Sequence, residues 1–366
     1  MLAGAGVLFL ALQFVYFVAV LSWSDARTRG VSYYGLPRTG RARYKSSLRW
    51  HARLLRPLLW LLSRTSRFSY SHASIRQRDV TGPKGACSAK SFAEGMAYVP
   101  KPEDVFVVTQ MKCGTTWMQH LVYEVVQRGR GHIVESGGTL YAIAPWLEAT
   151  TGVPIHRAPL HGADRPARIV KTHFPADVCP FSTEARYIYV ARHPVSCFAS
   201  CVDFIATNMG RMAPPLELTQ QWFCSREMWW SPWTHHVKGW WQRAQTKPNV
   251  LFLRFEDMKL DLPGIADRVA AFLGVLPLND WERDEIVRKC SFAYMQEHQD
   301  AFEMNPPHLL QTEAEMFVRG SVDRHQDVPY EMRRRILAWC VDDLKRSGFR
   351  IEEIYPEVTA AETAPN

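Results

Sequence analysis

The stretch VFVVTQMKCGTTW, residues 105–117, decides the fold of this chain. Its first four residues are β-branched or aromatic, and they form an apolar run as long as a buried strand. Gly114 and two threonines follow, and an amphipathic run continues to Val126. This pattern predicts a strand, a tight loop and a helix start, where backbone N–H groups bind anions. We therefore predict a site for a phosphate-like group, with Lys112 supplying charge.

The loop differs from the common nucleotide-binding loops. A Walker loop places its lysine directly after its second glycine, whereas Lys112 lies two positions before Gly114. No G-x-G-x-x-G pattern follows a predicted strand, so a dinucleotide-binding fold is weakly supported. Taken alone, the loop also allows a simpler reading, in which Gly114 only closes a turn and Lys112 is solvated.

Charge is distributed unevenly along the 366 residues. The hydrophobic content of 47% and the charged content of 22% are ordinary for a globular protein. Residues 1–78 contain thirteen basic residues and one acidic residue, a net charge of +12, which leaves −4 for the remainder of a total of +8. The basic character therefore belongs to the N-terminal segment, and this distribution does not favour a nucleic-acid-binding catalytic domain.

Residues 1–24 carry no charge and are long enough to span a bilayer. The basic excess follows at once, so the positive-inside rule predicts a single-pass anchor with the catalytic domain on the cytoplasmic side. A cleaved signal peptide is the alternative, but it would need a basic start. Residues 25–104 are predicted to be a basic juxtamembrane and lead-in segment, whose basic run over residues 27–78 can bind anionic lipid headgroups. The leucines of residues 54–62 suggest an interfacial helix, with a disordered linker as the alternative.

The eight cysteines are scattered, and none forms a C-x-x-C pair or has zinc spacing. Cys197 and Cys201 could share a helix face, but small buried hydrophobic residues explain such cysteines better than a metal does. We therefore predict no metal, and a reduced, cytoplasmic catalytic domain.

Further strand-like runs alternate with helix-like runs after residue 105. Strands are predicted over residues 168–172, 187–191 and 250–253, and helices are predicted to start near Pro194 and to stop at Gly274 and Gly348. This order predicts an α/β fold with a P-loop-NTPase-like parallel sheet and helices on both faces. We place this domain at residues 105–356 and a flexible tail at 357–366. Ligands of such sheets bind beyond the C-terminal ends of the strands.

Two more polar clusters fall at predicted strand ends. His173 closes the run Lys171-Thr172-His173, and a histidine there can take a proton near neutral pH. Arg192, with Ser200 eight residues later, offers a planar fork for phosphate. A packing histidine and a surface ion pair are the simpler readings of each cluster alone. Lys112, His173 and Arg192 each follow a predicted strand, and three cationic or titratable residues at one edge of a sheet predict a single site.

These motifs resemble those of the cytosolic-type sulfotransferases, which use 3′-phosphoadenosine 5′-phosphosulfate (PAPS), from about residue 105 to residue 349. The family loop P-K-S-G-T-T-W corresponds to residues 111–117, and its K-T-H to residues 171–173. Its spaced arginine and serine correspond to Arg192 and Ser200. Its W-W, Y-E-D-M and R-K-G elements correspond to residues 240–241, 255–258 and 318–320. With W-W and the following Y-E-D-M counted as one motif, five motifs in the same order make the resemblance specific.

The resemblance implies a role for each matching residue. It implies PAPS as co-substrate, in-line sulfuryl transfer, His173 as the catalytic base, and Lys112 and Lys171 as further catalytic residues. The implied PAPS-binding residues are Lys112, Cys113, Gly114, Thr115 and Thr116 at the 5′-phosphosulfate, Trp117 and Phe292 at the adenine, and Arg192, Ser200, Arg319 and Gly320 at the 3′-phosphate. Three positions depart from the family pattern, because Cys113 replaces serine, Val318 replaces arginine, and Thr234 stands where tyrosine is common.

The acceptor is expected to be a small and hydrophobic molecule with a hydroxyl or amine, and a membrane tether would favour a lipid-like one. Loops in residues 132–165 and 204–236 are expected to form its pocket. Aromatic residues that could line it, or could simply pack in the core, are Trp146, Phe204, Trp222, Trp229 and Trp230. Two other functions stay open: a phosphoryl-transfer enzyme, and a membrane-tethered nucleotide-binding module without catalysis. The family's dimerisation motif is not evident near residues 327–331.

Overall fold

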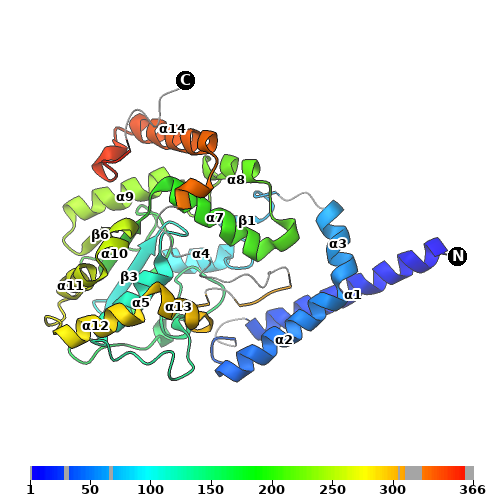
Figure 1. Cartoon of the computed structure of the whole chain (residues 1–366), viewed down its shortest axis with the longest axis horizontal. Coiled ribbons are helices and arrows are strands. Elements are labelled where there is room, and N and C mark those ends of the chain that lie inside the picture. Colours follow the sequence, from blue (N-terminus) through cyan, green and yellow to red (C-terminus); the bar gives the residue numbers. More distant parts are fainter. Residues whose placement is uncertain (1, 29–32, 66–68, 304–305, 310–323, 359–366) are drawn as a thin grey trace.

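A four-stranded parallel sheet forms the centre of the protein (Figure 1). The computed structural model describes residues 2–28, 33–65, 69–303, 306–309 and 324–358. The strands lie in the order β4 (Arg168–Thr172), β3 (Asp104–Thr109), β5 (Arg186–Ala191) and β6 (Val250–Arg254). Each begins and ends within one residue of its predicted position, so the four predicted strands are confirmed.

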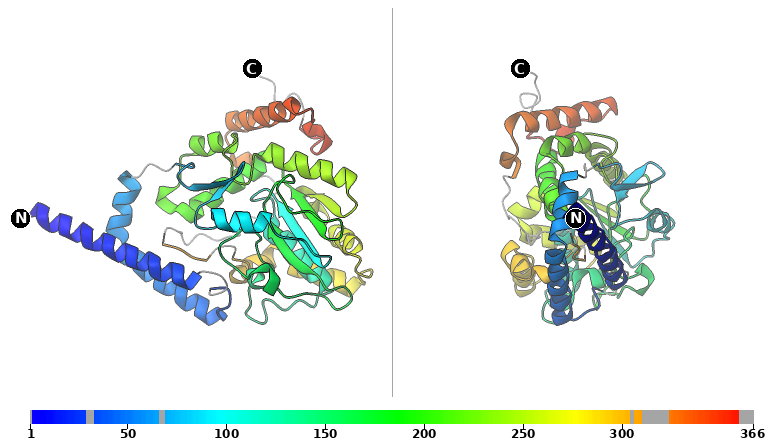
Figure 2. Two further views of the ribbon diagram at one scale, coloured as in Figure 1. Left: turned by 180° about the vertical axis from the view of Figure 1, so that it is seen from behind. Right: turned by 90° about the vertical axis from the view of Figure 1, so that its right-hand side faces the viewer.

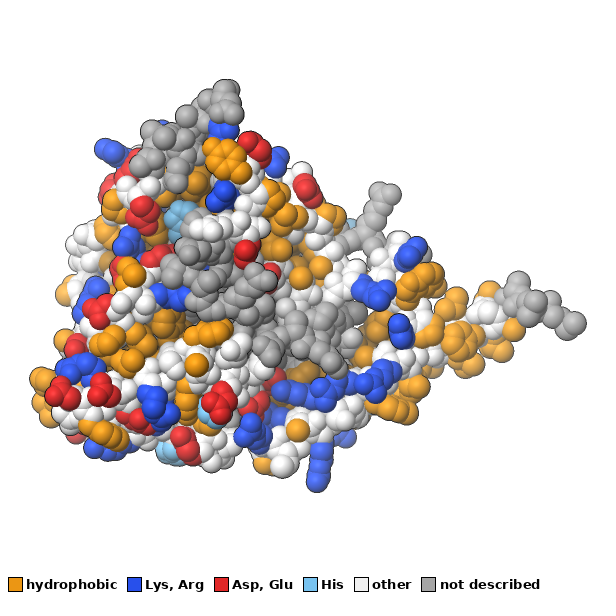
Figure 3. Space-filling view, in the orientation of Figure 1, with side chains coloured by type: hydrophobic (Ala, Val, Ile, Leu, Met, Phe, Trp, Pro, Cys, Tyr) orange, Lys and Arg blue, Asp and Glu red, His pale blue; other side chains and the backbone are white. Residues whose placement is uncertain are grey.

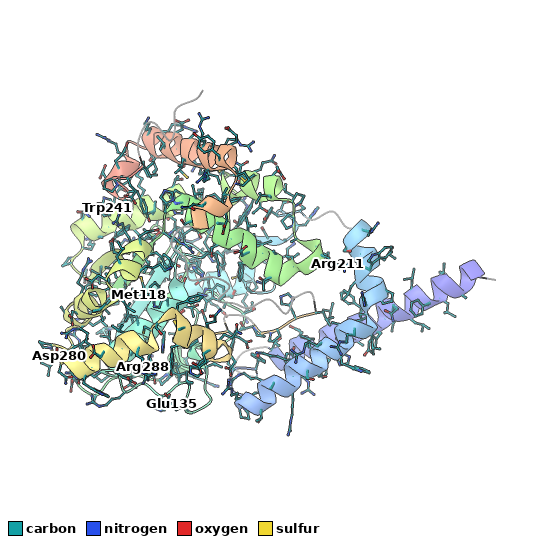
Figure 4. The ribbon with its side chains drawn as sticks, viewed as in Figure 1. Met118, Glu135, Arg211, Trp241, Asp280 and Arg288 are labelled. Atoms are coloured by element: carbon teal, nitrogen blue, oxygen red, sulfur yellow. The ribbon has the colours of Figure 1, made fainter. Side chains whose placement is uncertain are left out.

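Alternation along the buried strand β3 directs side chains to two separate cores. Val105 and Val107 pack in one core, and Phe106 and Val108 pack in the other, because successive side chains of a strand point to opposite faces. Helices α5 (Thr115–Val126), α11 (Leu262–Leu273) and α12 (Asp280–Lys289) contribute to the first core, whereas α7 (Pro194–Met209), α9 (Trp233–Thr246) and α14 (Tyr330–Arg346) contribute to the second. Met118 on α5, labelled in Figure 4, is fully buried. The predicted helices on both faces are therefore confirmed (Figure 2).

The predicted helix boundaries follow from proline and glycine chemistry. Pro194 occupies the first turn of α7, where its missing N–H leaves no helical bond unmade. Helix α11 ends before Gly274, whose φ of +72° closes the helix in the left-handed region. Helix α14 ends two residues before Gly348, which has a φ of +70°. The short remaining elements of this domain are α6 (Leu140–Ile143), α8 (Leu216–Phe223), α10 (Phe255–Leu260), α13 (Phe292–Glu297) and 3₁₀ turns at Ile155–Arg157, Gly210–Met212, Gln299–Ala301, Arg324–Asp327 and Ile351–Glu353.

The N-terminal segment forms three helices: α1 (Leu2–Thr28), α2 (Arg38–Leu54) and α3 (Arg56–Thr65). Helix α1 projects from the body and runs four residues past the predicted anchor, and α2 lies beside its C-terminal part (Figures 1 and 2). The helix expected over leucines 54–62 is divided at Leu55, because Pro57 restricts the preceding residue and supplies no N–H. Residues 38–65 are thus helical and do not form the disordered linker considered above.

Helix α2 is fixed to the sheet domain by buried contacts. The Arg41 side chain is almost fully buried, and its Nη1 donates to the carbonyls of Leu36 at 2.8 Å and Gly137 at 3.1 Å. The Tyr33 hydroxyl, just before α2, donates to Glu303 at 2.7 Å. An arginine buried with carbonyl partners holds one orientation, because losing them would leave its charge unsatisfied. The basic segment is therefore integrated into the fold.

The rest of the predicted lead-in segment also packs on the domain. Strands β1 (Ser74–Gln77) and β2 (Val80–Pro83) form an antiparallel hairpin, and α4 (Ala89–Met96) follows it. On α4, the ring of Phe92 meets that of Phe174 with centroids 5.3 Å apart. At the other end, Val358 is buried, so the packed structure extends two residues beyond the predicted boundary at 356.

Candidate active site

The loop between β3 and α5 has a conformation that only certain residues adopt easily. Gly114 caps α5 with a φ of +95°, and a Cβ at this position would lie 2.7 Å from Cδ2 of Phe255. Lys112 has a φ of +64°, which is uncommon for a residue with a side chain. Its carbonyl accepts a hydrogen bond of 2.9 Å from Arg192 Nη1. The loop is thus held in a strained form by the residue that follows β5.

One cavity of about 630 Å³ gathers most of the predicted site residues. It lies at the C-terminal ends of β3, β4 and β5, as parallel sheets require. Predicted residues that line it are Lys112, Gly114, Thr115, Thr116, Trp117, His173, Arg192, Ser200 and Phe292. Cys113 and Lys171 are not among its lining residues, and Arg319 and Gly320, like Val318, lie outside the described residues.

The Cys113 side chain points away from the cavity. Its Sγ lies 3.7 Å from Cys197 Sγ and 3.7 Å from the Met111 carbonyl, and the thiol is fully buried. Burial raises the pKa of this thiol well above its ordinary value, and the neighbouring Cys197 adds to the effect. The thiol is therefore held neutral beneath the loop. The exchange of serine for cysteine removes no hydroxyl from the cavity wall.

Thr234, the other departure in the described residues, is also turned inward. Its hydroxyl donates to Asp343 at 2.5 Å, and the residue is buried on α9. It does not line the cavity. Neither of the two departures that the structure describes, Cys113 and Thr234, is among the residues that line the cavity.

His173 follows β4 and is buried between two indoles. Its ring centroid lies 5.3 Å from that of Trp146 and 4.7 Å from that of Trp230. The ring Nδ1 lies 2.8 Å from the carbonyl of Thr109, and because a carbonyl only accepts, Nδ1 must carry the proton. Burial lowers the pKa of His173 well below its usual value, and the nearby Lys171 lowers it further. The ring is therefore neutral at pH 7, with a lone pair on Nε2.

A buried carboxylate fixes the backbone at this strand end. The two oxygens of Glu148 accept from the His173 backbone N–H at 2.8 Å and from the Thr172 hydroxyl at 2.9 Å. Burial raises the pKa of Glu148, while the Trp146 side chain and these two donors oppose that shift. Glu148 therefore positions His173 through its main chain.

Lys171 lies beneath the aromatic wall and not on it. Its ammonium is 3.6 Å from the ring centroid of Trp146, a cation–π contact, and 3.4 Å from the Tyr141 hydroxyl. Burial, together with Lys112, lowers its pKa to about 7. Its predicted catalytic role stays a prediction, since the side chain reaches the cavity only through its neighbours.

The cavity favours an anion. Its lining includes the cationic residues Lys84, Lys112, Arg192 and Lys259 but, among described residues, one carboxylate, Asp25. The guanidinium of Arg192 is buried 4.4 Å from the ring centroid of Phe255, and its Nε has no hydrogen-bond partner in the described structure. An unsatisfied buried guanidinium donor fits a phosphate oxygen. These residues therefore suit the phosphate groups of PAPS.

Aromatic residues line the cavity in both places where the sequence predicts them. Trp117 is fixed by its indole N–H, which donates to the Cys290 carbonyl at 2.8 Å, and Phe292 is partly exposed, so both offer ring surface to a purine. The four residues Trp146, Phe204, Trp229 and Trp230 line the cavity as expected for an acceptor pocket. Trp222 instead stacks on Tyr70 at 4.4 Å and belongs to the core.

Several residues that shape the site were missed at the sequence level. Phe255 was matched to a family motif, yet its place beneath Gly114 and Arg192 needed the fold. Glu148 lies in a loop and Tyr141 in the short helix α6, and neither segment carries a pattern that points to the site. The last turns of α1, predicted to be only an anchor, line the cavity with Leu21, Ser24, Asp25 and Thr28. Their spacing of three, one and three residues puts them on one helix face, a signal present in the sequence.

Comparison with known proteins agrees with this geometry. Residues 102–348 match the sulfotransferase domain family. Mouse sulfotransferase 2B1 is 29% identical over 257 residues, covering 68% of this chain and 73% of that protein. A guinea pig (Cavia porcellus) 3-alpha-hydroxysteroid sulfotransferase is 27% identical, covering 61% and 76%. Rat sulfotransferase 1A1 is 32% identical, covering 59% and 76%.

Solved structures share the fold. Retinol dehydratase in complex with androsterone and inactive cofactor PAP superposes with a TM-score of 0.60 at 21% identity, over 75% of this chain and 91% of that one. A mouse sulfotransferase complexed with PAP superposes with a TM-score of 0.58 at 19% identity, over 78% of this chain and 100% of that one. The match over two thirds of the chain, the fold and the cationic cavity lead to one conclusion: the chain belongs to the sulfotransferase domain family and is a PAPS-dependent sulfotransferase.

Proposed function

We propose that this enzyme sulfates a hydroxyl of a hydrophobic acceptor, with His173 as the catalytic base. The observation that carries the proposal is the hydrogen bond between His173 Nδ1 and the Thr109 carbonyl, 2.8 Å long. It keeps the proton on Nδ1 and leaves Nε2 as a proton acceptor. A base must be deprotonated to act, and the lowered pKa of His173 keeps it so at neutral pH.

In the proposed reaction, Nε2 of His173 takes the acceptor's hydroxyl proton while the acceptor oxygen forms a bond to sulfur. The bond between sulfur and the leaving phosphate oxygen breaks in line, so PAP and a sulfate ester are the products. By analogy with phosphoryl transfer, positioning and charge stabilisation supply most of the catalysis. Trp146 and Trp230 enclose the imidazole and would exclude water from it.

The cationic loop would stabilise the charge that develops on the leaving phosphate. Lys112 and the hydroxyls of Thr115 and Thr116 are the side chains for this role, and PAPS supplies the activated sulfuryl group. Arg192 and Ser200 would hold the 3′-phosphate, and Trp117 with Phe292 would hold the adenine. Arg319 and Gly320 remain assigned to the 3′-phosphate by resemblance alone, and Lys171 would tune the pKa of His173.

We further propose that α1 anchors the enzyme in a membrane, with the catalytic domain on the cytoplasmic side. The helix over Gly4–Thr28 contains an 18-residue window with a mean hydropathy of 2.2, and by length and composition it could cross a bilayer, although a signal sequence has the same properties. The contacts of the helix favour an anchor that is kept in the mature protein over a cleaved signal sequence, because Trp23 stacks on Tyr44 of α2 with ring centroids 5.3 Å apart. The basic residues of α2 and α3 follow the span, as the positive-inside rule requires. All eight cysteines are free, as in a reducing compartment.

The proposed acceptor class is a hydrophobic alcohol. Trp146, Phe204, Trp229 and Trp230 give the cavity an aromatic wall. Two similar proteins are named as steroid sulfotransferases, and the retinol dehydratase structures contain androsterone or retinol. Aromatic walls suit such flat apolar bodies.

The test uses the full-length protein in phospholipid vesicles with labelled PAPS. Androsterone, retinol and 2-naphthol serve as acceptors, and products are identified by mass spectrometry. We expect a sulfated alcohol without added metal. Tight PAP binding with no sulfated product from any acceptor would instead favour a non-catalytic nucleotide-binding module, and magnesium-dependent ATP hydrolysis would favour a phosphoryl-transfer enzyme.

A further inference from the structure

The C-terminal part of α1 and the catalytic loop border the same cavity. Leu21, Ser24, Asp25 and Thr28 of α1 line it, together with Lys112 and His173. The end of α7 lines it through Ile205 and Met209, and residues 306–308 complete this part of the wall. A predicted membrane anchor is thus also a wall of the space in which the chemistry takes place.

The contacts of α1 hold this wall in one position. The Ser24 hydroxyl lies 2.6 Å from the Tyr44 hydroxyl of α2, and the Tyr16 hydroxyl lies 2.6 Å from His51 Nδ1. The Tyr44 hydroxyl in turn lies 3.5 Å from the carbonyl of Pro307, another lining residue. Since α2 is fixed to the sheet domain by the buried Arg41, these bonds connect α1 to the body.

The N-terminal two thirds of α1 are apolar and exposed. Val7 is 69% exposed and Val15 is 66% exposed. Hydrophobic side chains run along this projecting helix, whereas Lys and Arg side chains gather over α2 and α3 (Figure 3). A contiguous apolar surface of this kind needs a nonpolar environment, and basic side chains next to it suit anionic lipid headgroups.

The depth of the helix relates the cavity to the bilayer surface. About 20 helical residues cross the hydrocarbon core of a membrane, so a span that begins at Leu2 ends near Leu21. Trp23 and Arg27 then fall at the interface, where tryptophan and basic residues gather. The cavity-lining face from Leu21 to Thr28 therefore lies at the level where a membrane lipid carries its hydroxyl or headgroup.

We propose that the last two turns of α1 form part of the acceptor site, and that the acceptor is a membrane-resident amphiphilic alcohol with a single hydroxyl on an apolar body. The alcohol enters from the bilayer beside Leu21, and its hydroxyl reaches His173 while its apolar body stays against α1. This inference rests on the proposed function and adds both the substrate class and the route of entry.

The test compares Leu21→Trp with Leu12→Trp in the full-length enzyme. Leu21 lines the cavity, whereas Leu12 is an exposed residue on the same helix and lies outside the lining. Each enzyme is placed in phosphatidylcholine vesicles containing cholesterol as the membrane alcohol, and 2-naphthol serves as a small, water-soluble acceptor. PAP binding is measured by calorimetry on the same preparations.

An indole at position 21 is larger than the leucine side chain and should project from α1 into the acceptor part of the cavity. We expect Leu21→Trp to raise the apparent KM for cholesterol by about tenfold or more, the loss that follows when one apolar side-chain contact is replaced by a clash. PAP affinity should change by less than about twofold, the KM for 2-naphthol should rise by a smaller factor than the KM for cholesterol, and Leu12→Trp should change none of the three. Equal behaviour of the two variants on cholesterol, or an equal loss on 2-naphthol in Leu21→Trp, would overturn the inference.

A failure of the proposed function would give a different result. Wild-type enzyme that binds PAP but sulfates neither acceptor would contradict the hydroxyl transfer itself. Wild-type enzyme that sulfates 2-naphthol but not vesicle cholesterol would leave the transfer intact and would contradict the membrane-alcohol proposal.

Discussion

Removing the imidazole of His173 should abolish most turnover while leaving the cofactor site intact. General base catalysis contributes about 10²- to 10⁴-fold, which corresponds to about 2.7–5.4 kcal/mol of transition-state stabilisation. We expect His173→Ala to lower kcat by that factor. The substitution also leaves the buried Thr109 carbonyl without its ring donor, at a cost of about 1–3 kcal/mol in the free energy of unfolding, so the protein should stay folded.

The assay follows sulfation of androsterone from labelled PAPS, with PAP affinity measured by calorimetry. PAP affinity should change by less than about threefold, because the ring contacts Thr109, Trp146 and Trp230 and not the Lys112 loop. His235→Ala is the control, since His235 is half-exposed near Asp177, away from the cavity, and should keep full turnover. A His173→Ala enzyme that retains more than a tenth of wild-type turnover would refute the assignment, and one that loses PAP binding would indicate a structural role.

Three further substitutions probe the same site. Lys171→Met should move the acid limb of the kcat/KM profile to higher pH. His173 acts as a base only when deprotonated, so activity falls as the pH drops through its pKa, and loss of the Lys171 charge removes one of the causes that lower this pKa, burial being the largest. An acid limb that does not move between pH 4.5 and 8 would contradict this. Arg192→Met should weaken PAP binding about 10- to 100-fold in calorimetry, because a charged hydrogen bond is worth about 1.5–3 kcal/mol, and unchanged affinity would exclude Arg192 from the 3′-phosphate site. Gly114→Ala should lower the free energy of unfolding, measured in urea, by about 2–5 kcal/mol, because alanine is strained in the left-handed backbone conformation and its Cβ would lie 2.7 Å from the Phe255 ring. A second substitution, Phe255→Leu, should restore only the part of this stability that is lost to the clash with the ring.

The sheet was predictable because its signals are local. The apolar run of residues 105–108 is a central strand whose side chains are buried on both faces, so its pattern is a continuous run rather than an alternation. The residues that follow each strand meet at one edge because parallel strands end together. Lys112, His173 and Arg192 could therefore be assigned to one site without a structure.

Side-chain direction was not predictable in the same way. Cys113 occupies a loop position that suggested a cofactor contact, but its thiol packs on Cys197 from a helix more than eighty residues away. Trp222 and Trp229 both read as pocket candidates, yet one stacks on Tyr70 in the core. The direction in which such a side chain points depends on partners that are distant in the sequence. Local secondary-structure propensity does not contain that information.

The N-terminal segment shows the same limit at a larger scale. Its apolar run and its basic residues predicted a tether and a linker, which are roles that need no tertiary contacts. The buried Arg41 and the cavity-lining Leu21 instead depend on surfaces formed by residues far along the chain. Composition indicates the properties of a segment by itself, so it could not predict that this segment packs on the sheet domain and forms part of the cavity wall.

The cavity-lining end of α1 has a practical consequence for handling this enzyme. A preparation that starts after residue 28, the usual way to obtain a soluble catalytic fragment, would retain the sheet, the loop and His173, yet it would open one side of the cavity to solvent. Acceptor affinities and inhibitor potencies measured on such a fragment would describe a wider and wetter site than that of the intact protein. Specificity screens should therefore use the intact chain in a bilayer or a detergent micelle.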